Sequence, residues 1–150
     1  LEQEFYIQGK YDGKQIYFHD NGKRSMEGFY DAGKKNGLFV KYYWNGNKQE
    51  SINYLYDVKN GLAKWYFDSG EISTQYTYSH GSIIDTVFVY YKDGTIKSKS
   101  SYSNNELFGS KVTFYPSGLI KEAGQYSGGV KTGQWCKYDS LGKEMDCVKY

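Results

Sequence analysis

The 150-residue chain is poor in proline, cysteine, histidine and arginine: it has one proline, two cysteines, two histidines and, among 19 basic residues, a single arginine, Arg24. The near absence of proline excludes a collagen triple helix. No apolar run approaches the ~20 residues that a membrane-spanning helix needs, so no span is expected. A net charge of +2 without arginine forks argues against nucleic acid as a partner, because phosphate recognition relies on a strong basic excess.

The sequence also lacks the motifs of catalytic and metal sites. It contains no Gly-x-Ser-x-Gly elbow, Walker loop or dinucleotide fingerprint. His19 and His80 stand in no metal-ligand spacing with each other or with the cysteines. We therefore predict no catalytic residue, no metal ligand and no cofactor, and we do not expect an enzyme.

What the chain has is 18 tyrosines and 18 glycines at a strict period. Glycine recurs every 24 residues from Gly22 to Gly142, and a second series runs from Gly13 to Gly133 with Asp85 in its one vacant slot. Such a period is typical of a repeat protein. We predict one repeat domain over 1–150, with a leading half-unit 1–12, repeats 13–36, 37–60, 61–84, 85–108 and 109–132, and a terminal partial repeat 133–150.

Each unit is predicted to be a β-hairpin. Runs such as 15–19 and 87–91 are rich in β-branched and aromatic residues and too short for helices. The turns, such as Asp20-Asn21-Gly22, suit a type I turn whose glycine forms a G1 bulge. The predicted fold class is all-β: an elongated, twisted, single antiparallel sheet, a solenoid-like array of six hairpin repeats with a leading N-terminal strand.

The turn also predicts which side chains share a face. Pairing His19 with Lys23 places the more apolar side chains on one side, which is the expected core face. In the first, third and fifth units this face comprises Ile16, Phe18, Arg24, Met26 and Tyr30; Lys64, Tyr66, Ile72, Thr74, Tyr76 and Tyr78; and Val112, Phe114, Ile120 and Tyr126.

The opposite face is mixed, with rings at repeat spacing among lysines and serines. One reading is a binding surface for a sugar chain or for the apolar surface of a partner. The other is that the rings pack on neighbouring hairpins and under lysine stems, which is the more usual role of any single ring. The binding candidates are Tyr17, Tyr43, Trp65, Phe67, Tyr91, Tyr115 and Trp135.

Cys136 and Cys147 lie on opposite strands of the last hairpin. The regular register puts them on opposite faces, which forbids a bridge, but a one-residue bulge near Glu144 and Met145 would bring them together. A disulfide and two half-buried thiols are both open. A disulfide favours an extracytoplasmic location, whether secreted, periplasmic or surface-anchored, over the cytoplasm. A start at Leu1 is expected of a processed protein.

The pattern Gly-x(4)-aromatic-aromatic-x-Asn/Asp/Ser-Gly, followed by lysine-rich residues and Tyr-x(3–6)-Gly, resembles the MORN repeat variant of bacterial proteins over residues 13–150. The resemblance implies successive antiparallel hairpins, with roles in scaffolding and protein contact and with lipid-headgroup binding also proposed. Some bacterial variants are labelled antitoxin components and others surface or secreted proteins. The family brings no catalytic residues. Asp85 departs from its pattern, so an irregular connection is expected between the third and fourth units.

These observations favour a non-catalytic scaffold that binds another protein, at the bacterial cell surface or as an antitoxin-like module. The alternative is a module that binds carbohydrate, cell wall or lipid headgroups through its aromatic face. A glycan or a membrane surface is accordingly the alternative partner.

Overall fold

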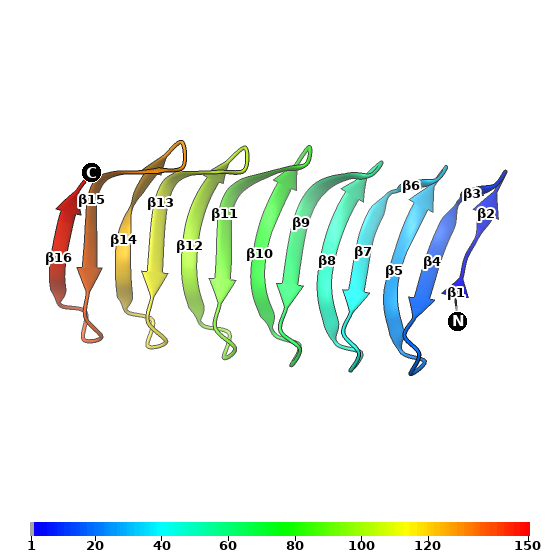
Figure 1. Ribbon diagram of the computed structural model, residues 1–150, viewed down its shortest axis with the longest axis horizontal. Helices are drawn as coiled ribbons and strands as arrows, with labels where there is room; N and C mark the ends of the chain where they lie inside the picture. Colours follow the sequence, from blue (N-terminus) through cyan, green and yellow to red (C-terminus); the bar gives the residue numbers. More distant parts are fainter. Residues whose placement is uncertain (1) are drawn as a thin grey trace. The chain divides into compact units, whose positions relative to one another are not determined.

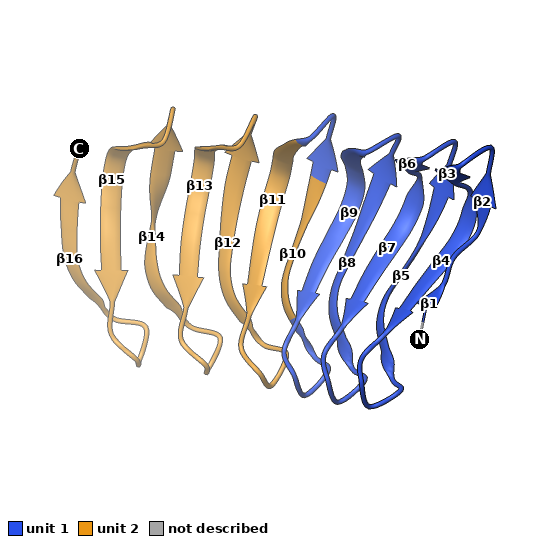
Figure 2. Cartoon of the chain, turned by 45° about the vertical axis from the view of Figure 1, so that its right-hand side comes forward, with its two compact units in different colours: residues 1–72, 78–81 blue, residues 73–77, 82–150 orange. Residues whose placement is uncertain are grey.

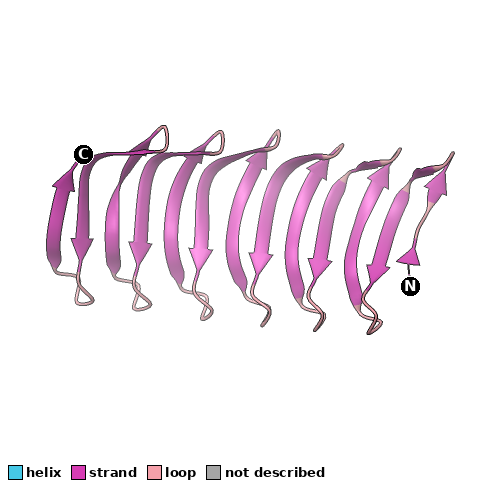
Figure 3. Ribbon diagram, viewed as in Figure 1, coloured by secondary structure: helices cyan, strands magenta, loops and turns pink. Residues whose placement is uncertain are grey.

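The computed structural model describes residues 2–150; Leu1, on which the expectation of a processed start rests, lies outside the described residues. Residues 2–150 form strands and no helix (Figure 3), so none of them belongs to a helix that could span a bilayer. The prediction of an all-β chain of antiparallel hairpins is confirmed. The strands are β1 (Glu2–Gln3), β2 (Tyr6–Ile7), β3 (Lys10–Tyr11), β4 (Gly13–Phe18), β5 (Arg24–Asp31), β6 (Lys34–Lys35), β7 (Gly37–Tyr42), β8 (Lys48–Leu55), β9 (Val58–Tyr66), β10 (Ile72–Ser79), β11 (Ser82–Tyr90), β12 (Ile96–Ser103), β13 (Glu106–Phe114), β14 (Ile120–Ser127), β15 (Val130–Tyr138) and β16 (Glu144–Lys149).

The chain divides into two compact units (Figure 2). Unit 1 comprises the described residues up to Ile72 together with 78–81, and unit 2 comprises 73–77 and 82–150. Within unit 1 the hydrogen-bonded order is β1-β4-β5-β7-β8-β9, with β6 beside β5 and β2 paired with β3. Within unit 2 the strands from β11 to β16 follow one another in chain order (Figure 1). Almost every strand therefore pairs with the strand next to it in sequence.

The turn predicted for each hairpin is confirmed. The carbonyl of His19 accepts a hydrogen bond from the amide of Gly22 at 2.9 Å, and the amide of His19 donates to the carbonyl of Lys23 at 2.8 Å. Gly22 has a φ of 79°, the left-handed conformation that favours glycine. The same pair of backbone bonds begins at Tyr43, Phe67, Tyr91, Tyr115 and Asp139.

The other end of each hairpin carries a two-residue turn that the sequence analysis did not identify. Both residues of each turn have positive φ, as in a type I′ turn. This turn is also present before the fourth unit, where Asp85 itself takes a φ of 64° and β11 runs without interruption. The expectation of an irregular connection there is wrong, because aspartate tolerates the left-handed region. The turns are Gln8-Gly9, Ala32-Gly33, Tyr56-Asp57, His80-Gly81, Asn104-Asn105 and Gly128-Gly129.

A second bulge overturns the predicted core face. Phe18 pairs with Arg24 as expected, but Tyr17 pairs with Met26, so Ser25 is an extra residue on β5. The same shift occurs in the hairpins β7–β8, β11–β12, β13–β14 and β15–β16. A one-residue shift moves every later side chain of a strand to the other face. The predicted core set therefore combined residues of β4 that lie on one face with residues of β5 that lie on the other. Met26 lies opposite Tyr17 and away from Ile16.

The most buried side chains come from both sides of the sheet: Phe39 belongs to the side that was predicted to be mixed, and Val40, which points to the opposite side, is 5% exposed. In unit 1, Phe39 is 6% exposed, Ile52 4% and Ala63 0%, and in unit 2 Trp135 is 4% exposed. Tyr78, predicted to be in the core, is buried as well. We call the side of unit 1 that carries Gln15, Tyr17, Met26, Phe39, Ile52 and Ala63 the Phe39 face. The Trp135 face is the side of unit 2 that carries Tyr91, Lys111, Thr113, Glu122, Trp135 and Tyr150.

Candidate binding surface

Four of the seven predicted binding residues lie in unit 1 and three in unit 2, and most of them serve the sheet itself. The hydroxyl of Tyr43 donates to the carbonyl of Tyr66 at 2.8 Å, which ties one hairpin to the next. Tyr91 and Tyr115 make the same bond, at 2.8 Å each, to the carbonyls 23 residues later. His19 occupies the equivalent position, with Nε2 3.1 Å from the carbonyl of Tyr42. These polar groups form a repeated link between hairpins.

The other predicted residues are held in different ways. Trp135 is buried, and its indole N–H donates to the carbonyl of Gln125 at 3.0 Å. The hydroxyl of Tyr17 donates to Glu4 at 3.1 Å, and burial raises the pKa of Tyr17. Hydrogen bonds from Tyr6 and Tyr11 lower the pKa of the same Glu4 carboxylate. Trp65 and Phe67 are half-buried.

On the Phe39 face and the Trp135 face, a large side chain of one hairpin packs against a small residue of the neighbouring hairpin. The ring of Phe39 lies against Gly28, where an added Cβ would fall 2.3 Å from ring carbons. Trp135 lies against Gly124 in the same way, at 2.2 Å. Ile52 faces Ala63 across β8 and β9, so the large and small partners are exchanged there. Close packing of this kind leaves little empty space.

The pair Ser100 and Lys111, at the equivalent place between β12 and β13, also joins a large residue to a small one, but both side chains are polar. Neither residue brings an apolar ring or a branched aliphatic side chain to a position that Phe39 and Trp135 fill with rings. Ser100 is buried and Lys111 is half-buried. This departure is visible in the sequence as a lysine in the series 15, 39, 63, 87, 111 and 135, whose one other polar member is Gln15.

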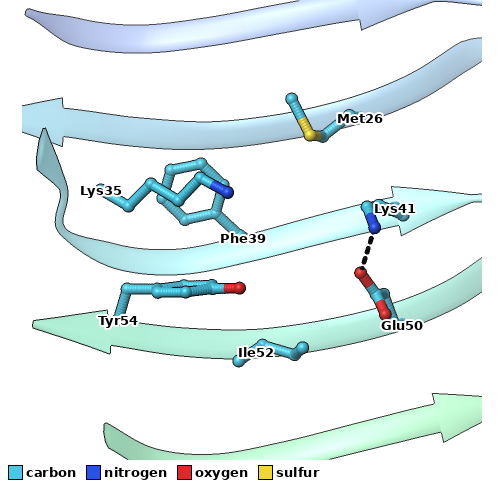
Figure 4. A pocket seen from close by; sticks show the side chains of 7 residues that line it. All are labelled: Met26, Lys35, Phe39, Lys41, Glu50, Ile52 and Tyr54. Atoms are coloured by element: carbon cyan, nitrogen blue, oxygen red, sulfur yellow. Dashed lines mark ion pairs between the residues drawn. The ribbon is translucent and has the colours of Figure 1, made fainter. Parts of the chain in front are cut away.

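On the Phe39 face, side chains from β5, β6, β7 and β8 line a small cavity (Figure 4). The cavity measures about 40 Å³. Lys41 forms an ion pair with Glu50 at 2.7 Å, so the charge at one end of the cavity is neutralised. At the other end, the ammonium of Lys35 lies 5.2 Å from the ring centre of Phe39 and 5.1 Å from that of Tyr54. We call this the Phe39 pocket.

The Trp135 face contains a larger hollow of about 310 Å³, lined by side chains that include Lys111. The exposed Lys97 and Lys121, the extra residues of their bulges, also line it. Their ammonium groups lie 5.7 Å from the ring centre of Tyr91 and 5.6 Å from that of Tyr115. We call this the Lys111 hollow. A further cavity of about 100 Å³ shares Lys121 with it.

The Lys111 hollow has an excess of positive charge. Within residues 2–150, none of Lys97, Lys111 and Lys121 forms an ion pair with a carboxylate. Glu122 is the one acid among the lining residues, and its carboxylate lies 3.7 Å from the ammonium of Lys131. The hollow can therefore attract an anionic group. The hollow could not be predicted from the sequence, because Lys97 and Lys121 reach it only through the bulges in β12 and β14.

Cys136 and Cys147 are joined by a disulfide, with 2.00 Å between the sulfurs and 4.1 Å between the Cα atoms. They are directly opposite each other on β15 and β16. The bulge that aligns them is the one that the other hairpins share, and not a special break in the last unit. Among residues 2–150, the one cluster of possible metal ligands combines these two sulfurs with Glu144, and the sulfurs are already bonded to each other.

Three segments of the chain match a known family of sequence repeats. The family model of the MORN repeat variant matches residues 11–32, 59–80 and 86–104. No curated protein matches the chain. Three segments of the chain are thus similar to MORN-variant repeats, and MORN repeats are generally associated with non-catalytic repeat scaffolds that bind proteins or membranes.

Proposed function

We propose that this chain of MORN-variant repeats is a non-catalytic scaffold that binds another protein through the Trp135 face. The observation that carries the proposal is the Lys111 hollow of about 310 Å³, which is larger than the cavity of about 100 Å³ beside it on the same face. Hollows of this size on a rigid strand framework hold several side chains of a partner. Rings beside the lysines add the apolar area that protein interfaces use.

The details of the rings favour a protein over a sugar chain. Sugar binding needs ring faces that are free to stack on the ligand. Trp135 is 4% exposed, and the hydroxyls of Tyr91 and Tyr115 are engaged with backbone carbonyls of the neighbouring hairpins. Five of the seven residues first predicted as binding candidates thus act as supports, and we assign the contact with the partner to the lysines and the half-buried rings around Lys111.

The proposal extends to the compartment. Disulfides persist in oxidising environments, so the Cys136–Cys147 bridge supports a location outside the cytoplasm. This location favours a role at the bacterial cell surface over an antitoxin-like role in the cytoplasm.

Capture experiments with matched charge variants test the proposal. Lys97→Glu with Lys121→Glu reverses two charges beside the hollow, and both side chains are exposed. Lys99→Glu with Lys143→Glu is the control, because it makes the same charge change at exposed sites that do not line the hollow. We expect a protein that the wild type and the control capture equally and that the first variant loses.

Two results would contradict the proposal. One is a captured protein that all three forms retain equally, since the Trp135 face would then have no part in binding. The other is the absence of any captured protein together with binding to a glycan array or to lipid vesicles, which would identify the alternative module.

A further inference from the structure

We propose that the Lys111 hollow is a carboxylate-binding subsite, and that the partner docks there with an acidic segment of its chain. The inference rests on the proposed function and makes it specific, because it names the chemistry of the partner. It is carried by three observations: the position of Lys111, the lack of a carboxylate partner within residues 2–150 for three ammonium groups, and the size of the hollow.

At four of the other five positions in the series of Lys111 the chain has an apolar side chain, and the fifth, Gln15, is buried and hydrogen-bonded to the backbone of Phe5. Lys111 stands opposite Ser100 on β12 and opposite Gly124 on β14. At the equivalent position Phe39 and Trp135 fill the space against a glycine, and Ala63 fits against Ile52. The Ser100–Lys111 pair forfeits this apolar burial and leaves a hollow of about 310 Å³. A loss of packing at one repeat is expected where a surface serves binding.

The ammonium groups around the hollow are oriented by rings and left without carboxylates. Lys111 lies over Tyr126, with 5.7 Å between the ammonium and the ring centre. Lys97 and Lys121 lie over Tyr91 and Tyr115 at similar distances. A neutral aromatic ring leaves the charge of the cation in place, so the cation still attracts an anion. An incoming carboxylate can therefore gain charge-assisted hydrogen bonds without displacing an internal acid.

The amount of charge favours an acidic protein segment over a membrane. Recognition of anionic lipid by a polybasic surface takes about 4–8 basic residues, whereas three lysines line this hollow. The hollow also contains apolar surface from Val89 and the ring of Tyr91. A glutamate or aspartate beside an apolar residue on an extended segment matches both features.

A titration followed by ¹⁵N–¹H NMR tests the inference, with acetylated hexaglutamate as the probe and acetylated hexaglutamine as its neutral counterpart. We expect hexaglutamate to shift the amide signals of Val89, Ser98 and Thr113 in a manner that weakens with added salt. Hexaglutamine should leave them in place. Lys111→Val, which installs the residue that the chain has at position 87, should weaken hexaglutamate binding about tenfold or more.

The controls separate binding from folding. Lys99→Val removes an exposed lysine from the neighbouring strand outside the hollow, and it should leave the titration unchanged. Lys111→Arg keeps the charge and should retain binding. If Lys111→Val disturbs the spectrum of the free protein, Lys111→Gln replaces it, since it removes the charge and keeps an unbranched polar side chain.

Three results would overturn the inference: equal binding of hexaglutamate by the wild type and Lys111→Val, equal binding of hexaglutamine, or binding of phosphatidylserine vesicles in place of hexaglutamate. The capture experiment distinguishes this failure from that of the proposed function. If Lys97→Glu with Lys121→Glu still loses the partner while hexaglutamate fails to bind, the protein-binding face stands and only the acidic chemistry of the partner is wrong.

Discussion

The Phe39 pocket in unit 1 and the Lys111 hollow in unit 2 occupy equivalent places in the repeat and are built in opposite ways. Around Phe39, a ring fills the space against Gly28, an ion pair between Lys41 and Glu50 neutralises one end, and about 40 Å³ remains. Around Lys111, no ring fills the space, the lysines have no carboxylate partner within residues 2–150, and about 310 Å³ remains.

The contrast shows that the hydrogen bonds that hold the hairpins together do not depend on which side chains fill the faces of the sheet. Turn bonds such as the one from Gly22 to His19 and the links through Tyr43 and Tyr115 recur whatever fills the faces. Because nearest-neighbour contacts carry the stability of a repeat protein, one poorly filled position weakens it only locally. A position such as 111 is therefore free to serve a ligand.

The largest expected effect is a difference in stability between a variant at Phe39 and a variant at Lys111. Phe39→Ala should lower the free energy of unfolding by about 3–5 kcal/mol, because it removes a buried ring and leaves a cavity. Lys111→Ala should change it by less than about 1 kcal/mol, since the half-buried lysine leaves the hollow already unfilled. Urea unfolding followed by circular dichroism measures both. Equal losses would mean that Lys111 is as much a part of the core as Phe39.

Removal of the disulfide should have the next largest effect. Cys147→Ser opens a loop of the last hairpin and should lower the free energy of unfolding by about 3 kcal/mol under the chain-entropy account. Thermal unfolding with and without a reducing agent measures it, and the reduced wild type should match the variant. An unchanged midpoint would show that the last hairpin adds nothing to the stability of unit 2.

The large–small pairing in unit 1 predicts a rescue. Gly28→Ile alone should cost about 1–3 kcal/mol, because its Cβ would overlap the ring of Phe39. Gly28→Ile combined with Phe39→Ala recreates the Ile52–Ala63 pair and should be more stable than Phe39→Ala alone. Comparison of the unfolding midpoints of the two single variants and the double variant tests this. Simple addition of the two losses would show that the faces are not filled by exchangeable pairs.

Much of the hairpin framework could be predicted from the sequence because its signals are local. The asparagine or aspartate and the glycine at positions such as 21 and 22 favour one turn type, and the period of 24 repeats it. Asp85 adopts the same left-handed backbone conformation as the glycines at the equivalent position of the other repeats. The two-residue turns at the other end were missed since Tyr56-Asp57 and Ala32-Gly33 carry weaker turn signals than Asn-Gly.

The faces could not be predicted in the same way, because one extra residue per hairpin decides them. Ser25, Lys97 and Lys121 carry no sequence mark that distinguishes a bulge from a regular strand residue. Because the extra residue Ser25 was not predicted, Met26 and the following residues of β5 were assigned to the wrong face. Disulfide pairing and the Lys111 hollow both depend on this bulge, so the candidate site required the structure.

Loss of one hydroxyl link should have a smaller effect, and the same effect in both units. Tyr43→Phe in unit 1 and Tyr115→Phe in unit 2 each remove one hydrogen bond of 2.8 Å while keeping the ring, so each should cost about 1 kcal/mol. Chemical denaturation of the two variants provides the comparison. If Tyr115→Phe were neutral while Tyr43→Phe was not, the hydroxyl beside the Lys111 hollow would be available to a ligand.

The smallest expected effect concerns Glu27 of unit 1. Its carboxylate forms ion pairs, whereas the lysines around Lys111 have no carboxylate partner within residues 2–150. Glu27 accepts a hydrogen bond from Tyr42 and pairs with Lys14 and Arg24. These contacts, led by the Tyr42 hydroxyl, lower the pKa of Glu27, while burial and Glu27 raise the pKa of Tyr42 to about 12, so the hydroxyl remains a donor at neutral pH.

A lowered carboxyl pKa means that the folded state binds the proton more weakly than the unfolded state. Its stabilisation is present above the ordinary glutamate pKa of about 4.3 and is lost as the pH falls through the lower pKa of the folded state. Glu27→Gln should therefore cost less than about 1 kcal/mol at pH 7, because the paired lysine and arginine are half exposed, and nothing at pH 2. Unfolding midpoints measured from pH 7 to pH 2 would show the two curves converging. Curves that stay parallel would assign the effect of Glu27 to packing and not to its charge.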